Sequence, residues 1–238
     1  MSIAEKLTTI AENEQKVFDA GKKAEYDKWW DTLQPNDDLY GYTYSFYKWS
    51  RNIFFPKKNL ICSSCTSMFQ FFEQRNTEPF DLAARLEECG KVLDTSNVSS
   101  ANGMNYSFYW TSFSRIPHID LSSFTGSALN TFGYNGHLET IDKITSNEKI
   151  VWNNTFYTSN PVPTMPLKNI VFDGVIGQNI DFQYCPLLTH DSLISIINAL
   201  KDYSGTGTTR TLILHKDAKA KLSESEIAVA TQKGWTVA

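Results

Sequence analysis

The stretch "LNTFGYNGHLETI", residues 129–141, decides the fold because its order of residues returns in "NNTFYTSNPVPTMPLKNI", residues 153–170. In both stretches Asn-Thr-Phe comes first and Leu-x-x-Ile follows. The two Asn-Thr-Phe triplets begin at Asn130 and Asn154, and we call the separation of these two positions the repeat interval. The Leu-x-x-Ile groups begin at Leu138 and Leu167, slightly further apart, and the loop-like run "NPVPTM" accounts for the excess. We infer that one structural unit is used at least twice.

A third copy lies upstream in "NYSFYWTSFSRIPHIDLSS", residues 105–123, where Phe108 precedes Phe132 by one repeat interval. In this copy Ile116…Ile119 is the expected counterpart of Leu138…Ile141. A fainter copy begins at "SCTSMFQFF", residues 64–72, and "KVLDTSN", residues 91–97, is strand-like. An apolar residue followed by Asp also recurs, and we expect each Asp to accept a turn amide or to take part in a cation or glycan site: Asp94, Asp120, Asp142 and Asp181.

Self-similarity with a period of about 20–29 residues predicts a leucine-rich-repeat solenoid. One short strand and one return segment cannot bury their apolar side alone, but stacked copies can. Residues 101–200 contain 30 Ser, Thr and Asn but only 11 charged residues. That balance favours turns in which polar side chains bond backbone groups over a solvated charged surface.

Residues 1–34 differ from the rest, with seven acidic and five basic residues, no Pro, and long helix formers. Ser2 and Glu5 fit a capping box that opens a helix. Apolar residues then follow a heptad-like spacing. Two interpretations remain open: an amphipathic helix lying on its own domain, or a short coiled-coil-like helix for oligomerisation or docking. The docking residues would be Ile3, Leu7, Ile10 and Val17.

The remaining parts give an α/β chain with a solenoid between two caps. Residues 35–59 predict a linker and an aromatic N-terminal cap, with an exposed aromatic binding strip as the alternative. Residues 60–188 hold the irregular repeats. Residues 189–238 predict a C-terminal helix-strand-helix-strand cap, with Thr189 and the capping box Ser223-Glu224-Ser225-Glu226 opening its helices, and Trp235 in the last strand.

These residues carry a family resemblance. "IDLSSFTGSALNTFGYNGHLETIDKI", residues 119–144, and "NTFYTSNPVPTMPLKNIVFDG", residues 154–174, resemble BspA-like leucine-rich repeats. The opening, residues 3–31, and the tail, residues 187–238, are similar to small repeat proteins encoded in phages and prophages of gut bacteria. The resemblance implies a solenoid with a binding or virion-associated role and no enzymatic activity. It brings no defined ligand site.

Residues that could carry chemistry are scattered. Cys62 and Cys65 have zinc-knuckle spacing, but a structural zinc site needs four ligands and no second pair follows. Cys89 and Cys185 stand alone, so we expect free, mostly buried thiols. The four histidines are spread along the chain, at His118, His137, His190 and His215. We therefore expect no enzyme, no metal and no cofactor.

The net charge and the hydropathy of the chain exclude some classes of binding partner. A net charge of -4 and a pI near 5.6 argue against nucleic acid. The N-terminus lacks an apolar signal-peptide core, and no apolar run is long enough to predict membrane insertion. We expect a virion protein, cytoplasmic before release.

The expected function is recognition of a host-surface or partner component, a protein or a surface glycan, through the solenoid. The alternative is a structural component of virion or tail assembly. In that case residues 1–34 would bind further copies of this chain or another virion protein. An exposed patch is expected at Tyr109, Trp110, Trp152 and Tyr157, unless these side chains serve packing between repeats.

Overall fold

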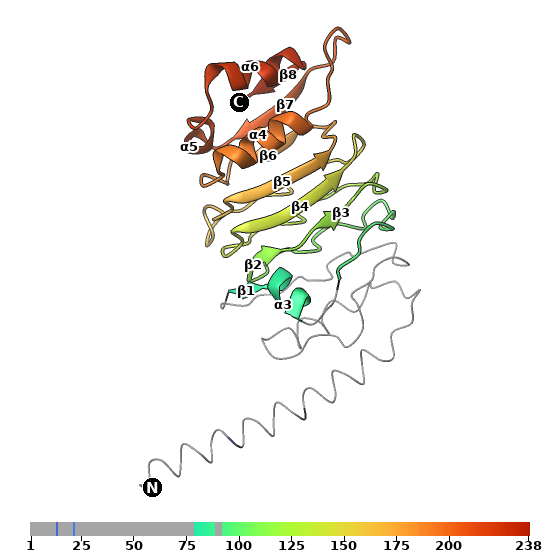
Figure 1. Cartoon of the computed structure of the whole chain (residues 1–238), viewed down its shortest axis with the longest axis vertical. Helices are drawn as coiled ribbons and strands as arrows, with labels where there is room; N and C mark the ends of the chain where they lie inside the picture. The colour runs from blue at the N-terminus through green and yellow to red at the C-terminus, as the bar shows by residue number, and fades with distance from the viewer. Residues whose placement is uncertain (1–12, 14–20, 22–78, 89–91) are drawn as a thin grey trace.

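The structure is a computed structural model that describes residues 13, 21, 79–88 and 92–238. Figure 1 shows a stack of parallel strands that ends in helices at the C-terminal end. The described part is mixed α/β with two small parallel sheets, which confirms the α/β class. The expectations for 1–34 and 35–59, including docking by Ile3, Leu7, Ile10 and Val17, lie outside the described residues, as does the copy at 64–72.

The elements follow one another in a simple order. The first sheet and its flanking helix comprise β1 (Phe80–Asp81), α3 (Leu82–Glu88), β2 (Phe113–Ile116), β3 (Ile119–Asp120), β4 (Thr140–Ser146) and β5 (Asn169–Gly174). The C-terminal elements are β6 (Ile180–Phe182), α4 (His190–Ala199), β7 (Arg210–Leu214), α5 (Lys216–Lys219), α6 (Glu224–Gln232) and β8 (Trp235–Val237).

The first sheet fixes the register of the repeats. Its strands are all parallel, with Ile116 opposite Ile141 and Ile141 opposite Ile170. The expected equivalence of Ile141 and Ile170 is confirmed. The equivalence of Ile116 with Leu138 is wrong, because the pairing of Ile116 with Ile141 makes the fully buried Phe113 the counterpart of Leu138. Apolar residues at 113, 116 and 119 give two possible registers in the sequence, and only strand pairing distinguishes them.

The return segments stack as closely as the strands. Phe108 N donates to Thr131 O and Phe132 N donates to Thr155 O, both at 2.9 Å. Behind this ladder the buried phenylalanine rings form a continuous row, with centroid distances of 5.5, 5.5 and 4.5 Å. The row consists of Phe108, Phe132, Phe156 and Phe182.

Each residue of the Asn-Thr-Phe triplet has a structural role that follows from its residue type. Asn130 and Asn154 have φ of 50° and 49°, in the left-handed region that Asn adopts more readily than most residues. The next residue, Thr131 or Thr155, is buried and its hydroxyl donates to a carbonyl of the preceding turn at 2.8 or 2.9 Å. The third residue supplies a ring of the phenylalanine row. The triplet therefore turns the chain, joins it to its neighbour and fills the core.

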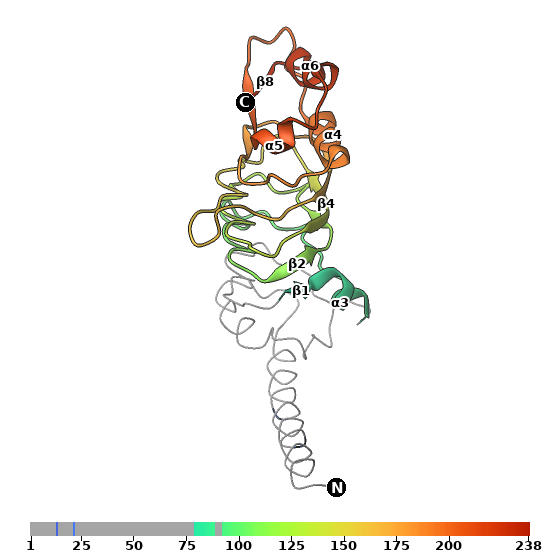
Figure 2. The same ribbon diagram turned by 90° about the vertical axis from the view of Figure 1, so that its left-hand side faces the viewer.

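Helix α4 ends the first sheet. Ser192 Oγ accepts from Ile170 N at 3.0 Å, and Ser195 Oγ accepts from Phe172 N at 2.9 Å. Serine side chains thus satisfy the edge of β5, where a further strand would otherwise be needed. In Figure 2 the strands of the first sheet and helices α4 and α6 lie along one side, and the return segments lie along the other.

The tail follows the expected order α4, β7, α6, β8, with short α5 in addition. Thr189 caps α4, and Ser223 and Glu226 form the expected capping box of α6. Gly234, with φ of 84°, follows α6 and leads into β8. Strand β6 pairs with β7, and β7 pairs with β8. The second sheet therefore spans the expected boundary between 60–188 and 189–238.

Candidate functional site

Half-buried aromatic rings form a row along the stack, which we call the aromatic column. Trp110 and Tyr134 stack at 5.6 Å with an interplanar angle of 25°. Tyr134 meets Tyr157 at 5.8 Å, and Tyr157 meets Tyr184 at 5.2 Å. Near Trp110 the column continues through two more rings in contact. Its members are Tyr106, Tyr109, Trp110, Tyr134, Tyr157 and Tyr184, all partly exposed.

The return ladder places these rings at the same corner of each turn. Trp110 and Tyr134 are separated by one repeat interval, and both have positive φ, 52° and 58°. Tyr109 and Tyr157 occupy the adjacent position of their turns, where the middle turn has Gly133. A Cβ at Gly133 would lie 3.0 Å from Tyr157 O and 3.4 Å from Tyr109 Cδ2. The glycine therefore leaves room for the aromatic ring of the neighbouring turn.

Three of the four residues expected in the surface patch lie in the column: Tyr109, Trp110 and Tyr157. The expectation for Trp152 is wrong, because Trp152 is only 3% exposed and packs edge-on against Phe172 at 5.6 Å. Trp152 follows the fully buried Ala128 by one repeat interval, so this position of the turn faces the core.

Sequence reasoning missed three members of the column, Tyr106, Tyr134 and Tyr184. The signal for Tyr134 is present, since it follows Trp110 by one repeat interval. Tyr106 likewise precedes Asn130 by one repeat interval and shares its positive φ. Tyr184 follows β6, whose place on the return side is set by Phe182 stacking on Phe156. The sequence alone offered no reason to place β6 on that side.

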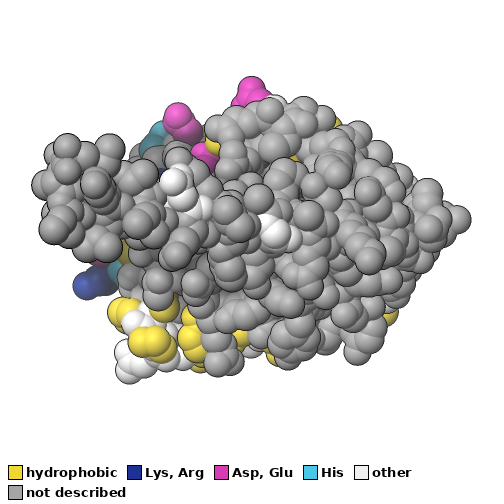
Figure 3. Space-filling view, turned by 90° about the horizontal axis from the view of Figure 1, so that it is seen from below, with side chains coloured by type: hydrophobic (Ala, Val, Ile, Leu, Met, Phe, Trp, Pro, Cys, Tyr) yellow, Lys and Arg dark blue, Asp and Glu magenta, His cyan; other side chains and the backbone are white. Residues whose placement is uncertain are grey.

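Most of the column lies in uncharged segments of the chain, whereas Tyr184 lies near Asp181. The return segments 101–112, 125–137 and 151–167 contain no Asp, Glu, Lys or Arg. Their polar side chains are mainly Asn, Ser and Thr, and the Tyr134 hydroxyl lies 2.6 Å from Ser159 Oγ. In Figure 3, most yellow apolar or aromatic side chains gather with white polar ones along the lower side, with a dark-blue Lys or Arg and a cyan His at the left-hand end, while most magenta carboxylates lie along the upper side.

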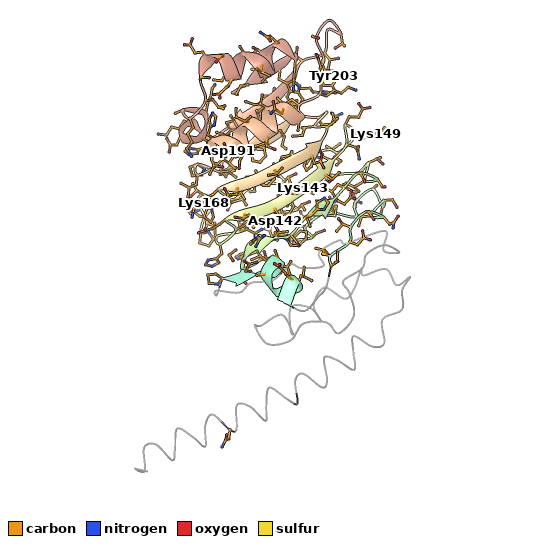
Figure 4. All side chains as sticks on the ribbon, in the orientation of Figure 1. Asp142, Lys143, Lys149, Lys168, Asp191 and Tyr203 are labelled. Carbon is orange, nitrogen blue, oxygen red and sulfur yellow. The ribbon has the colours of Figure 1, made fainter. Side chains whose placement is uncertain are left out.

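The outer face of the first sheet is charged, but its charges are paired between neighbouring turns. Arg115 makes a two-fold contact with Asp142, at 2.6 and 3.0 Å, and this contact raises the pKa of Arg115. Lys168 contacts Glu139 at 2.9 Å. Figure 4 shows Asp142, Lys143 and Lys168 along this sheet. A charged ligand here would compete with pairs that the repeats already form.

The recurring aspartates accept hydrogen bonds from the backbone of their own turns, with one exception. Asp94, Asp120 and Asp181 each accept from the backbone N–H of the second residue ahead, at 2.7–3.0 Å, as expected. Burial raises the pKa of Asp181. Asp142 instead pairs with Arg115. The residue opposite Asp120 on the neighbouring strand is Thr145, so Asp120 and Asp142 do not lie opposite each other.

Three of the four described histidines have a hydrogen-bond partner within the fold, and the described cysteine is buried. His118 Nε2 lies 2.8 Å from Thr145 Oγ1, His190 Nε2 lies 2.8 Å from Glu226 Oε1, and His215 caps α5. Cys185 is a fully buried free thiol, and burial strongly raises its pKa. The expectation of free, mostly buried thiols also covers Cys62, Cys65 and Cys89, which lie outside the described residues. Within 79–88 and 92–238 no group of three or more His, Cys, Asp and Glu is arranged to hold a metal.

A separate groove of about 730 Å³ lies between α4 and α6, beside β5. Its lining includes apolar Phe172, Ile194 and Val229. Its polar members are His190, Asp191, Ser195, Asn198 and Glu226, of which His190 and Glu226 contact each other. The groove therefore has a mixed apolar and polar lining, and it lies apart from the aromatic column.

In the part of the chain that the structure describes, no helix has both the length and the hydropathy to cross a membrane. No protein-family model matches the chain, and no curated protein or solved structure is similar enough to count as a match.

Proposed function

We propose that this chain is a non-enzymatic recognition protein that binds a host-surface or partner component through the aromatic column. The column itself is the observation that carries the proposal. Its six rings are partly exposed and contact one another along the stack. Tyr and Trp dominate binding surfaces because they offer a large rigid apolar area together with a polar group.

The scaffold supports this role. The proposed fold is an irregular leucine-rich-repeat solenoid of the BspA-like kind. Parallel strands in register and a return ladder that joins equivalent corners of successive turns support it. Backbone hydrogen bonds join each ring-bearing turn to the next, for example Trp110 N to Gly133 O at 2.9 Å and Tyr134 N to Tyr157 O at 3.0 Å. Rings held in this way lose little conformational freedom when a ligand binds.

The proposed setting is a phage particle. It rests on the resemblance of residues 3–31 and 187–238 to small phage and prophage repeat proteins. In this setting residues 1–34 attach the chain to the particle or to further copies, and the repeats face outward. The competing role, a purely structural component of virion or tail assembly, needs the attachment but gives the aromatic column no ligand.

A binding assay with intact cell envelopes tests the proposal. Labelled full-length protein is titrated onto envelopes of candidate host bacteria, with unlabelled protein as competitor. The test variant combines Tyr134→Ala with Tyr157→Ala. The control combines Asn169→Ala with Val171→Ala, two exposed positions on β5. Circular dichroism spectra and thermal unfolding verify that both variants fold.

Saturable binding is expected, weakened at least about tenfold by the column variant and unchanged in the control, since buried aromatic anchors each contribute more than about 1 kcal/mol. Equal binding by the folded column variant would remove the column from the function. Absence of binding by the unaltered protein to every envelope would favour the structural role in assembly.

A further inference from the structure

We infer that the ligand of the aromatic column is a neutral glycan whose chain runs along the stack axis from turn to turn. This inference rests on the proposed function and narrows it to one class of ligand. Three properties of the column lead to it: the absence of charge, the kind of polar group beside the rings, and the regular spacing of the rings.

The first property is the absence of charged residues from the return segments that carry most of the column. The return segments 101–112, 125–137 and 151–167 bring no Asp, Glu, Lys or Arg to this side of the molecule. A phosphate, sulfate or carboxylate is normally bound by Arg, Lys or a cluster of N–H groups, because an ion that loses water needs a charged or strongly polar partner. On the first sheet and at its edge, the cations Arg115, Lys143 and Lys168 are instead paired with carboxylates of neighbouring turns. An acidic polymer would therefore find no Lys or Arg in these three described return segments.

The polar groups beside the rings are hydroxyls and amides. Tyr134 and Ser159 place two hydroxyl oxygens 2.6 Å apart at the middle of the column. Asn160, which follows Ser159 directly, is exposed. Hydroxyl and amide groups both donate and accept hydrogen bonds. A sugar ring offers the complementary surface, since its hydroxyls do the same and its C–H groups form an apolar face for an aromatic ring.

The spacing of the rings favours a polymer of repeating units. From Trp110 through Tyr134 and Tyr157 to Tyr184, successive centroids lie 5.6, 5.8 and 5.2 Å apart. Each step corresponds to one turn of the stack and is comparable to the length of one sugar in an extended chain. The interplanar angles change from 25° to 61° and 82°, so the contacts pass from stacked to edge-on along the column, and each of these rings is partly exposed.

A folded protein partner fits this site less well. A standard protein interface buries about 800 Å² on each partner and involves about 20–30 residues on each side. The column has three contacting rings in the turn of residues 106–110, and from Tyr134 through Tyr157 to Tyr184 it narrows to one ring per turn. A narrow row of that kind matches a linear ligand that contacts one turn after another.

Competition on envelopes decides between the ligand classes. Glycans released from a bound envelope are separated by anion exchange into a neutral and an acidic fraction, and each fraction competes with labelled full-length protein. The neutral fraction is expected to displace the protein. Periodate, which cleaves vicinal diols, is expected to abolish binding, and a change from about 50 to about 500 mM salt is expected to alter the affinity less than about twofold, because no ion pairs form.

The outcomes separate this inference from the proposed function. Displacement by the acidic fraction alone would overturn the neutral-glycan inference, as would binding that survives periodate but is lost after protease treatment of the envelope. In both cases the proposed function stands, provided that Tyr134→Ala with Tyr157→Ala still weakens binding. Binding that is insensitive to this column variant would overturn both.

Discussion

Replacement of Asn135 by Ala is expected to be among the most destabilising polar substitutions in the repeats. The Asn135 side chain is fully buried and makes four hydrogen bonds. Its Oδ1 accepts from the amide and the hydroxyl of Thr111, at 2.6 and 2.9 Å. Its Nδ2 donates to Phe108 O at 2.8 Å and Phe132 O at 2.9 Å. One side chain thus joins two neighbouring turns at the corner that bears the aromatic column.

The magnitude follows from the groups that lose a partner. In Asn135→Ala the Thr111 amide and two carbonyls remain buried without their bonds, and each such group costs about 1–3 kcal/mol. A water molecule entering the vacated space restores part of this. We therefore expect a loss of about 3–4 kcal/mol in the free energy of unfolding. Asn147→Ala is the matched control, because Asn147 Nδ2 also donates to three carbonyls but at a half-exposed site, where about 1 kcal/mol is expected.

The assay is urea unfolding followed by circular dichroism and tryptophan fluorescence at pH 7. A second variant, Asn135→Asp, probes the donors alone. The introduced Asp places a carboxylate oxygen against two carbonyl oxygens. The Asn135→Asp protein should therefore be less stable than the Asn135→Ala protein at pH 7. Burial raises the folded-state pKa of the introduced carboxyl, so its contribution is fully present below the unfolded value of about 3.9 and is lost as the pH rises through the folded value. Relative to the unaltered protein at the same pH, Asn135→Asp should recover stability on acidification.

Two results would refute this reasoning. A loss below about 1 kcal/mol for Asn135→Ala, equal to that of Asn147→Ala, would mean that the four hydrogen bonds contribute no more than solvated ones. A difference between Asn135→Asp and the unaltered protein that does not depend on pH would mean that the introduced carboxyl is not buried among the carbonyl oxygens.

Three further predictions concern the core and the end of the sheet. Phe132→Ala removes the middle ring of the phenylalanine row and should lower the free energy of unfolding by about 3–5 kcal/mol in urea unfolding, against less than about 1.5 kcal/mol for Thr140→Ala on the outer face. Ser192→Ala leaves the Ile170 amide at the edge of β5 without its acceptor and should cost about 1–3 kcal/mol and speed amide hydrogen exchange at Ile170; exchange that stays unchanged would contradict the capping role of α4. The pKa of Cys185 is raised in the folded state, so stability is retained below the unfolded value of about 8.5 and falls above it; at pH 10 the unaltered protein should have lost about 2 kcal/mol more than Cys185→Ala, and equal pH profiles would argue against a buried thiol.

Much of the local structure followed from the sequence because its causes are local. Asn130 turns the chain, Thr131 bonds to the preceding turn, and Phe132 fills the core, and each of these roles belongs to the residue type itself. The helix starts at Thr189 and Ser223 were predicted correctly for the same reason, since a cap depends on a hydroxyl and an amide a few residues apart.

The candidate site was predicted in part. Tyr109, Trp110, Trp152 and Tyr157 were expected in an exposed patch because they are aromatic, but exposure depends on the direction that a position takes within the turn. Trp152 has the same residue character and points into the core, beside the buried position of Ala128 in the neighbouring turn. Aromatic type therefore predicts a large contact area, and only the register of neighbouring turns shows whether that contact faces a ligand or the core.

By itself the sequence determined the repeated Asn-Thr-Phe unit, the helix starts at Thr189 and Ser223, and the α/β character, because hydrogen-bonding capacity, backbone preference and apolar spacing act over a few residues. Only the tertiary structure decided between the two registers that residues 113–119 allow, placed β6 beside β7, and used Ser192 of α4 to complete the edge of β5. These outcomes depend on which segments meet across a whole turn of the stack or more. Contacts between segments so far apart in the chain depend on how all the turns pack together. No short stretch of sequence contains that information.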